Sequence, residues 1–220
     1  MEHEGGITAS HCARIEEEGY TIIDDFLNES IILSLLKDIQ KVQSDGRLKA
    51  NTTHFTLANG KSTFFNKPYI QEGDLHNHEI RPYVPNIQKL FTSKRIVKML
   101  QHNLPHYGLQ DDGRALKMQY NGGKGGCFPY HYDNPGRPNK RKLTCLLYMN
   151  LKWKVEDGGE LELQPFLRPC VKIPPLFNRM VSDEIDDAIL IRILYSFYRL
   201  FLKVILSFIV FCQLGKSDIV

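Results

Sequence analysis

Apolar residues recur at helical spacing in the first hundred residues. Between residues 31 and 42 they stand at 31, 32, 35, 36, 39 and 42, which predicts an amphipathic helix packed against a sheet. A second helical pattern covers Pro85 to Leu100, and a short helix over His11 to Glu18 should end at Gly19. A strand is predicted over Tyr20 to Ile23, followed by a helix cap at Asn28 or Ser30.

From Lys117 to Pro165 the pattern changes to short apolar runs separated by turn residues. Four strands are predicted in this stretch: one ending near Tyr120, one carrying His131, a buried one over Leu143 to Asn150, and an alternating one over Glu160 to Gln164. The turns between them are Gly-rich, Asn-Pro-Gly and Asp-Gly-Gly. Short strands at this spacing favour an antiparallel barrel or jelly roll, so the expected class is α+β with flanking N-terminal helices.

Residues 45 to 67 are polar and have few packing anchors, so we expect a mobile loop or an irregular hairpin. Repeats, low-complexity tracts and a second domain are absent from the pattern. The expected organisation is a helix and strand support region over residues 1–113, a partial core over 114–181 and a divergent hydrophobic tail over 182–220.

Composition narrows the choice of function. The net charge is +3 and only Arg137 to Lys142 is densely basic, which argues against a nucleic-acid-binding face. Five cysteines without CxxC spacing give neither a zinc signature nor a disulfide framework. The N-terminus lacks the pattern of a signal peptide. We therefore expect a cytoplasmic or nuclear protein.

His131 and Asp133 are the main candidates for chemistry. Residues i and i+2 of a strand point to the same face, so one imidazole and one carboxylate are presented together. They would supply two of the three protein ligands of a 2-His-1-carboxylate iron site. His-x-Asp alone is a weak signal, and its flanks decide. The other histidines that could be ligands, His54, His76, His78, His102 and His106, are interpreted as surface residues.

The order Tyr, Gly-rich turn, His-x-Asp-Asn, basic stretch, strand with Tyr, Trp and Gly-Gly-Glu-Leu resembles the prolyl-4-hydroxylase-like branch of the 2-oxoglutarate- and Fe(II)-dependent oxygenases, nearest to the hypoxia-factor prolyl hydroxylase (egg-laying-defective-nine) type. The opening GY-x-x-x-D-D-F-L and the later F-N-R-M-V fit the same family. The resemblance implies a double-stranded β-helix, or jelly roll. It also implies Fe(II), 2-oxoglutarate, O2 and L-ascorbate, and a protein or peptide substrate that is hydroxylated at proline.

The resemblance also implies roles for single residues. His131 and Asp133 would be the metal ligands, Tyr148 would hydrogen-bond the cosubstrate and Tyr120 would line the pocket. Asn134 and Arg141 would shape the loop after the metal strand.

The family pattern breaks after Val181. The family continues with a second ligand His and an Arg for the far carboxylate of 2-oxoglutarate, but no histidine follows His131 in this chain. Arg192 and Arg199 match nothing in the motif.

The tail from Ile185 to Leu214 is rich in Ile, Leu and Phe without alternation, which predicts a helix over about 186–214 in place of missing C-terminal strands. A membrane span through 193–214 is an alternative, although its longest run without a charge is only eleven residues.

Three functions follow from these observations. The first is an Fe(II)- and 2-oxoglutarate-dependent dioxygenase acting on a protein. The second is a catalytically impaired isoform or pseudoenzyme that lacks the distal His and the Arg. The third is a tail-anchored membrane protein with an oxygenase-like head.

Overall fold

The computed structural model describes residues 6–56, 59–123, 125–133, 141–184, 189–195 and 203–212. The α-helices are α1 (Ala9–Glu18), α2 (Glu29–Ser44), α3 (Pro85–Thr92) and α4 (Arg95–Asn103), and three short 3-10 turns are η1 (Arg81–Tyr83), η2 (Pro105–Tyr107) and η3 (Val155–Asp157). The strands are β1 (Tyr20–Ile23), β2 (Lys49–Thr56), β3 (Ser62–Asp74), β4 (Leu109–Asn121), β5 (Phe128–His131), β6 (Arg141–Tyr148), β7 (Gly158–Pro165), β8 (Val171–Ile173), β9 (Arg179–Glu184), β10 (Ile189–Tyr195) and β11 (Lys203–Cys212).

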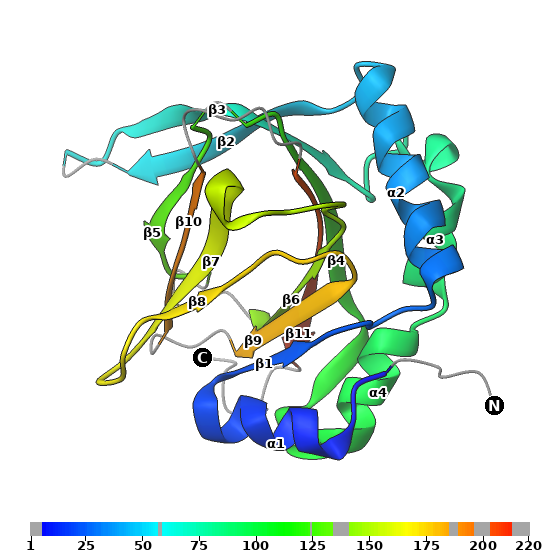
Figure 1. Cartoon of the computed structure of the whole chain (residues 1–220), viewed down its shortest axis with the longest axis vertical. Coiled ribbons are helices and arrows are strands. Elements are labelled where there is room, and N and C mark those ends of the chain that lie inside the picture. Colours follow the sequence, from blue (N-terminus) through cyan, green and yellow to red (C-terminus); the bar gives the residue numbers. More distant parts are fainter. Residues whose placement is uncertain are drawn as a thin grey trace.

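The strands form two antiparallel sheets that face each other, with the helices on the outside of the larger one (Figure 1). The large sheet has the order β1-β9-β6-β11-β4-β3-β2 and the small sheet β5-β10-β7-β8. Along the chain from β4 to β11, successive strands alternate between the two sheets except at the β7–β8 hairpin. This arrangement of eight strands is a jelly roll, as the sequence predicted.

Two apolar cores lie on opposite faces of the large sheet. The barrel core lies between the sheets and consists of Ile70, Phe128, Leu146, Tyr148, Leu161, Leu163, Ile173, Val181, Ile191 and Ile205. The outer core lies between the large sheet and the helices; its members include Ile15, Leu35, Val97, Leu116, Leu147 and Leu206. In the large sheet, alternate residues of a strand therefore enter different cores, so the core that one side chain occupies predicts the face of the next.

The N-terminal predictions are confirmed. Helix α1 ends at Gly19, whose φ of 83° gives the left-handed cap expected of glycine. Asn28 caps α2 by accepting from the backbone N–H of Ser30 at 3.0 Å. The polar stretch before Lys67 forms most of the β2–β3 hairpin, and the second helical pattern is divided into α3 and α4 at Lys94, which has a φ of 56°.

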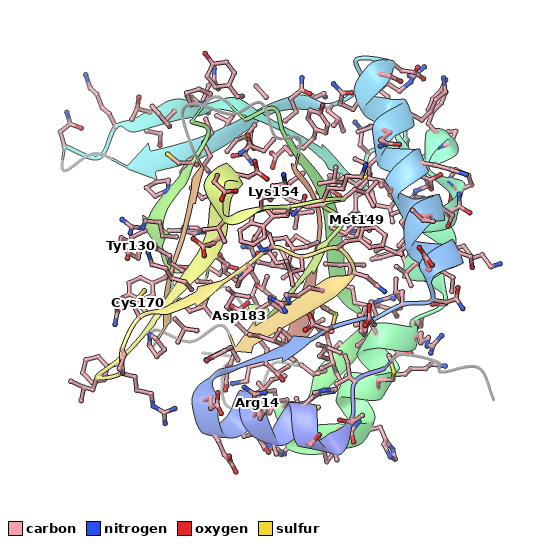
Figure 2. All side chains as sticks on the ribbon, viewed as in Figure 1. Arg14, Tyr130, Met149, Lys154, Cys170 and Asp183 are labelled. Atoms are coloured by element: carbon pink, nitrogen blue, oxygen red, sulfur yellow. The ribbon has the colours of Figure 1, made fainter. Side chains whose placement is uncertain are left out.

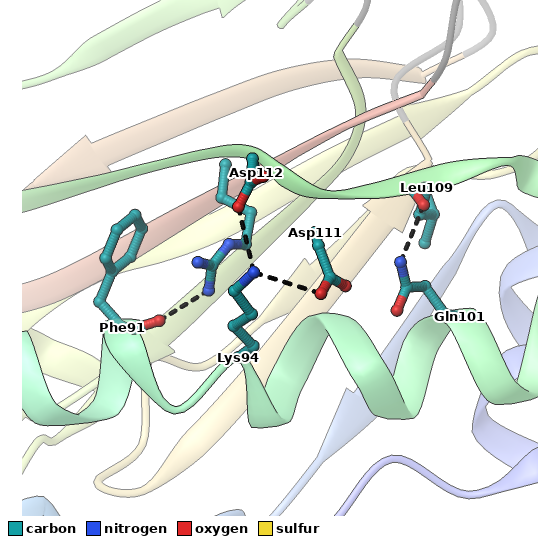
Figure 3. A network of polar contacts seen from close by, with 7 residues as sticks. Phe91, Lys94, Gln101, Leu109, Asp111 and Asp112 are labelled. Atoms are coloured by element: carbon teal, nitrogen blue, oxygen red, sulfur yellow. Dashed lines mark hydrogen bonds and ion pairs between the residues drawn. The ribbon is translucent and has the colours of Figure 1, made fainter.

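A polar network fastens α3 and α4 to β4 (Figure 3). The ammonium group of Lys94 lies 3.3 Å from Asp111 and 3.1 Å from Asp112. Arg114 donates to the carbonyl of Phe91 at 2.6 Å, and Gln101 donates to that of Leu109 at 2.9 Å. Because these bonds join both helices to one strand, they hold the support layer in place behind the barrel.

The predicted helix over residues 186–214 is wrong. Strand β10 lies between β5 and β7, and β11 lies between β6 and β4, so the C-terminal strands are present and complete both sheets. The residues of β11 enter both cores: Leu206 and Val210 pack in the outer core and Ile205 in the barrel core. A strand buried on both faces carries apolar residues continuously, and such a run imitates a buried helix in the sequence.

A membrane-spanning helix was the other interpretation of the tail. Among the described residues, no helix is long and apolar enough to cross a membrane.

Candidate functional site

The Gly-rich turn between β4 and β5 is held against β3. Gly122 donates its N–H to the carbonyl of Tyr69 at 2.8 Å, and Gly123 donates to the side chain of Asn121 at 2.9 Å. A Cβ on Gly126 would lie 2.8 Å from the carbonyl oxygen of Pro68, closer than a side chain tolerates. Glycine is therefore required at residue 126 by close packing, and the turn delivers β5 to the edge of the small sheet.

An irregularity in the pairing of β5 with β10 turns two of its side chains into the barrel. His131 is opposite Ile191, whereas Phe128 is opposite Ile193, so the pairing shifts between them. Phe128 belongs to the barrel core, and its ring centroid lies 6.4 Å from that of His131. The bulge thus places His131 beside the barrel core at the end of β5.

His131 and Asp133 lie side by side. The Nε2 atom of His131 is 3.2 Å from Oδ1 of Asp133, and Nδ1 lies 2.8 Å from the carbonyl of Pro129. A carbonyl only accepts, so Nδ1 carries the proton and Nε2 faces the carboxylate. Burial lowers the pKa of His131, but the hydrogen bonds to Asp133 and Pro129 outweigh it and raise the pKa above its ordinary value.

Strand β6 orients Asp133. Thr144 donates its hydroxyl to Oδ2 of Asp133 at 2.8 Å, and Arg141 donates to the backbone carbonyl of Asp133 at 3.2 Å. Burial raises the pKa of this carboxyl, whereas the hydrogen bonds from His131 and Thr144 lower it, and the net pKa is below the ordinary value. Asp133 is therefore ionised near neutral pH, with Oδ1 directed at the imidazole.

This pair fits a divalent cation as a two-ligand site. One imidazole nitrogen and one ionised carboxylate oxygen, each held by a second hydrogen bond, are the donor set and the support that metal ligands require. Within the part of the chain that the structure describes, no three His, Cys, Asp or Glu side chains are grouped to hold an ion. The residue opposite His131 on β10 is Ile191, which offers no donor.

The two tyrosines predicted at the site lie in different cores. Tyr148 is fully buried in the barrel core, on the same face of β6 as Thr144. Tyr120 belongs to the outer core and lines a cavity of about 540 Å³ beside Lys67 and Gly122. The structure therefore brings Tyr148, His131 and Asp133 to the same interior and places Tyr120 on the other face of the large sheet.

Asp183 was not predicted from the sequence as a site residue. It is 1% exposed on β9, opposite Thr144 and on the same face as Val181 of the barrel core (Figure 2). Neither of its carboxyl oxygens accepts a hydrogen bond from another described residue. Burial, and secondarily the charge of Asp133, raise the pKa of Asp183 well above its ordinary value. The sequence did offer a signal for Asp183: it lies two residues after Val181, and residues i and i+2 of a strand face the same side.

Lys67 was not predicted either, because it ends a polar stretch without readable pattern. Its ammonium group lies 3.9 Å from the centre of the Phe128 ring. Burial lowers the pKa of Lys67 to about 8, against a smaller opposing effect of Glu72. The electrostatic influence of Asp133 also reaches this amine, so Lys67 belongs to the surroundings of the His131–Asp133 pair.

The remaining candidates lie elsewhere. Arg192 stands on the outer face of the small sheet, where its Nε donates to Glu162 at 2.6 Å and its guanidinium covers the ring of Tyr130 at 4.2 Å. Asn134 and Arg199 lie outside the described residues. Four of the other histidines, His76, His78, His102 and His106, are exposed, as predicted.

Comparison with known proteins gives a consistent result. A model of the 2OG-Fe(II) oxygenase superfamily matches residues 116–186. A prolyl 4-hydroxylase structure from Phytophthora capsici is 35% identical, with a TM-score of 0.79 over 96% of this chain and 68% of that one. A prolyl hydroxylase from Trichoplax adhaerens, solved with a hypoxia inducible factor peptide fragment, is 21% identical over 92% and 88% of the two chains, with a TM-score of 0.73. A Pseudomonas putida prolyl-4-hydroxylase is 13% identical over 93% and 98%, also with a TM-score of 0.73.

Proposed function

This chain belongs to the 2OG-Fe(II) oxygenase superfamily and has a prolyl 4-hydroxylase-like fold, and we propose that it is a dioxygenase that holds Fe(II) through His131 and Asp133. One observation carries the proposal. An ionised carboxylate and an imidazole nitrogen lie 3.2 Å apart beside the barrel core, each fixed by a second hydrogen bond. This is the spacing and the chemistry of two ligands directed at one cation.

The residues of this chain have separate tasks in the proposed reaction. Nδ1 of His131 donates to Pro129, which leaves Nε2 available as a ligand once the proton it shares with Asp133 is lost. Thr144 keeps Asp133 in place. Tyr148, inside the barrel, would donate its hydroxyl to the cosubstrate. When bound, Fe(II) would supply the reaction of O2 with 2-oxoglutarate, in which CO2 is lost, one oxygen atom enters succinate and the other hydroxylates a C–H bond of the substrate.

For the substrate we propose a protein or peptide carrying proline. Two observations support this proposal. The similar structures are prolyl hydroxylases, and the Trichoplax adhaerens protein was solved with a hypoxia inducible factor peptide fragment. Ascorbate, as the reductant that keeps the iron in its ferrous state, is proposed on the same family resemblance.

A second candidate function is a catalytically impaired member of the family. It is favoured by the sequence, which has no histidine after His131, and by Ile191, which lies opposite His131 on β10. Strands β10 and β11 complete the barrel but add no third ligand among the described residues. We therefore expect weak metal binding and negligible turnover of 2-oxoglutarate. Each missing hydrogen bond to a charged group, such as that of the absent Arg to the cosubstrate, costs about 1.5–3 kcal/mol of binding free energy.

Titration of Mn(II) into the apoprotein tests the ligand assignment. Asp133→Ala should abolish the binding that the wild type shows, whereas Asp112→Ala, at a highly exposed carboxylate on β4, should leave it unchanged. Equal affinity in the wild type and Asp133→Ala would contradict the assignment.

Succinate formation from 2-oxoglutarate then separates the two candidate functions. A rate comparable to that of a complete enzyme favours the dioxygenase, and the absence of turnover despite metal binding favours the impaired derivative.

A further inference from the structure

Lys67 provides a positive charge beside Phe128 of the barrel core. The residue lies on β3, and its ammonium group sits over Phe128, the barrel-core residue of β5 that neighbours His131. Distances of 3.9 Å from the amine to the Phe128 centroid and 6.4 Å between the Phe128 and His131 centroids limit the separation of the amine from the His131 ring to about 10 Å. A small elongated ligand can therefore touch both.

This amine has no anionic partner among the residues that the structure describes. The only contact that the structure shows for its ammonium group is the face of Phe128, and no described carboxylate lies within ion-pair distance of it. Burial removes hydration from this half-buried ammonium group and lowers its pKa to about 8, and the charges of Glu72 and Asp133 offset this effect only in part. An arriving carboxylate would supply the missing counter-ion.

Two other cationic side chains already have carboxylate partners. Lys117 lies 3.8 Å from Glu72, whose carboxylate also accepts from Asn51 at 2.6 Å. Arg192 is paired with Glu162 on the outer face of the small sheet. Of these three cations, only Lys67 combines a position near the His131–Asp133 pair with the lack of a direct ion pair to a described carboxylate.

We propose that Lys67 binds the far carboxylate of the 2-oxo dicarboxylic acid cosubstrate, at the opposite end from the His131–Asp133 pair. The inference rests on the proposed function, because it assumes that the oxo acid binds beside that pair. It assigns to β3 an anion-binding role for which the tail offers no described residue. The amine acts by ion pairing and hydrogen bonding alone, with no covalent step.

The experiment compares two ligands on the full chain saturated with Mn(II). 2-Oxoglutarate carries the far carboxylate, and 2-oxobutyrate lacks it. Lys67→Met keeps the apolar stem over Phe128 and removes the charge. We expect this variant to lose about 10- to 100-fold in affinity for 2-oxoglutarate and to bind 2-oxobutyrate like the wild type. Lys67→Arg should retain most of the affinity, and Lys61→Met, at an exposed lysine of the same hairpin, should change nothing.

A second measurement does not depend on substitution. Reductive methylation near pH 8 should modify Lys67 readily, because a large share of this amine is neutral there, and 2-oxoglutarate should protect it while 2-oxobutyrate does not. Mass spectrometry of the labelled peptide gives the rate.

The possible results have distinct meanings. Wild-type protein that binds 2-oxoglutarate, with an unchanged Lys67→Met and no protection, overturns the role of Lys67 and leaves the proposed function standing. Wild-type protein that binds neither oxo acid overturns the proposed function and this inference with it.

Discussion

Replacing Asp183 by valine should stabilise the protein at neutral pH. Asp183 is 1% exposed, and neither carboxyl oxygen receives a hydrogen bond from another described residue. It stands on β9 between Thr144 of β6 and Tyr20 of β1. Valine is β-branched and apolar, so it suits a buried strand position next to the barrel core.

The size of the effect follows from the burial. Keeping a carboxyl of ordinary pKa, about 3.9, neutral at pH 7 costs about 4 kcal/mol, which is the ceiling for this contribution. A buried polar group without a hydrogen bond costs about 1–3 kcal/mol. Local rearrangement in the variant offsets part of either gain. We therefore expect Asp183→Val to raise the free energy of unfolding by about 1–4 kcal/mol at pH 7.

The pH dependence has a definite sign. Burial raises the pKa of Asp183 in the folded state, so the folded protein holds this proton at pH values where the unfolded chain has lost it. The penalty is therefore absent below the unfolded pKa and grows as the pH rises toward the folded pKa. The stability difference between Asp183→Val and the wild type should shrink as the pH falls from about 7 toward about 4.

Urea unfolding of both proteins at several pH values between about 4.5 and 7 measures this difference. Glu17→Ala is the matched control, because this carboxylate is exposed on helix α1 and its removal should give little change. A variant less stable than the wild type at pH 7, or a difference independent of pH, would show that Asp183 has a stabilising partner and that the reasoning is wrong.

Three further changes test other parts of the structure. Ile191→His places an imidazole opposite His131, and Mn(II) titration should show about tenfold tighter binding or more; unchanged affinity would contradict the pairing of β10 with β5. Gly126→Ala should lower the free energy of unfolding, measured in urea, by about 1–3 kcal/mol because its Cβ would meet a backbone carbonyl at 2.8 Å, whereas Gly122→Ala, with 3.6 Å available, should cost less. Arg192→Met should lower the urea midpoint only slightly, because its ion pair with Glu162 is partly exposed, and it should leave 2-oxoglutarate binding unchanged; weaker ligand binding would place Arg192 at the site.

The local pattern of the sequence determined much of the support layer and of the strand that carries His131. Gly19 caps the end of α1 and Asn28 caps the start of α2, because glycine and asparagine satisfy backbone requirements within a few residues. The Gly-rich turn before β5 and the bounded apolar run of β6 were likewise readable. Such features depend on residues that are close together along the chain, so the sequence alone is enough to predict them.

Only the tertiary structure decided the secondary structure of the tail and the surroundings of the candidate site. The run that forms β11 is apolar throughout because it is covered by the outer core on one face and the barrel core on the other, and a sequence cannot show how many faces will be covered. Asp183 and Lys67 acquire their unusual environments from β6 and β5, which are distant from them in the sequence. Burial and charge at these positions depend on which strands become neighbours, and that is settled only when the two sheets close around the barrel core.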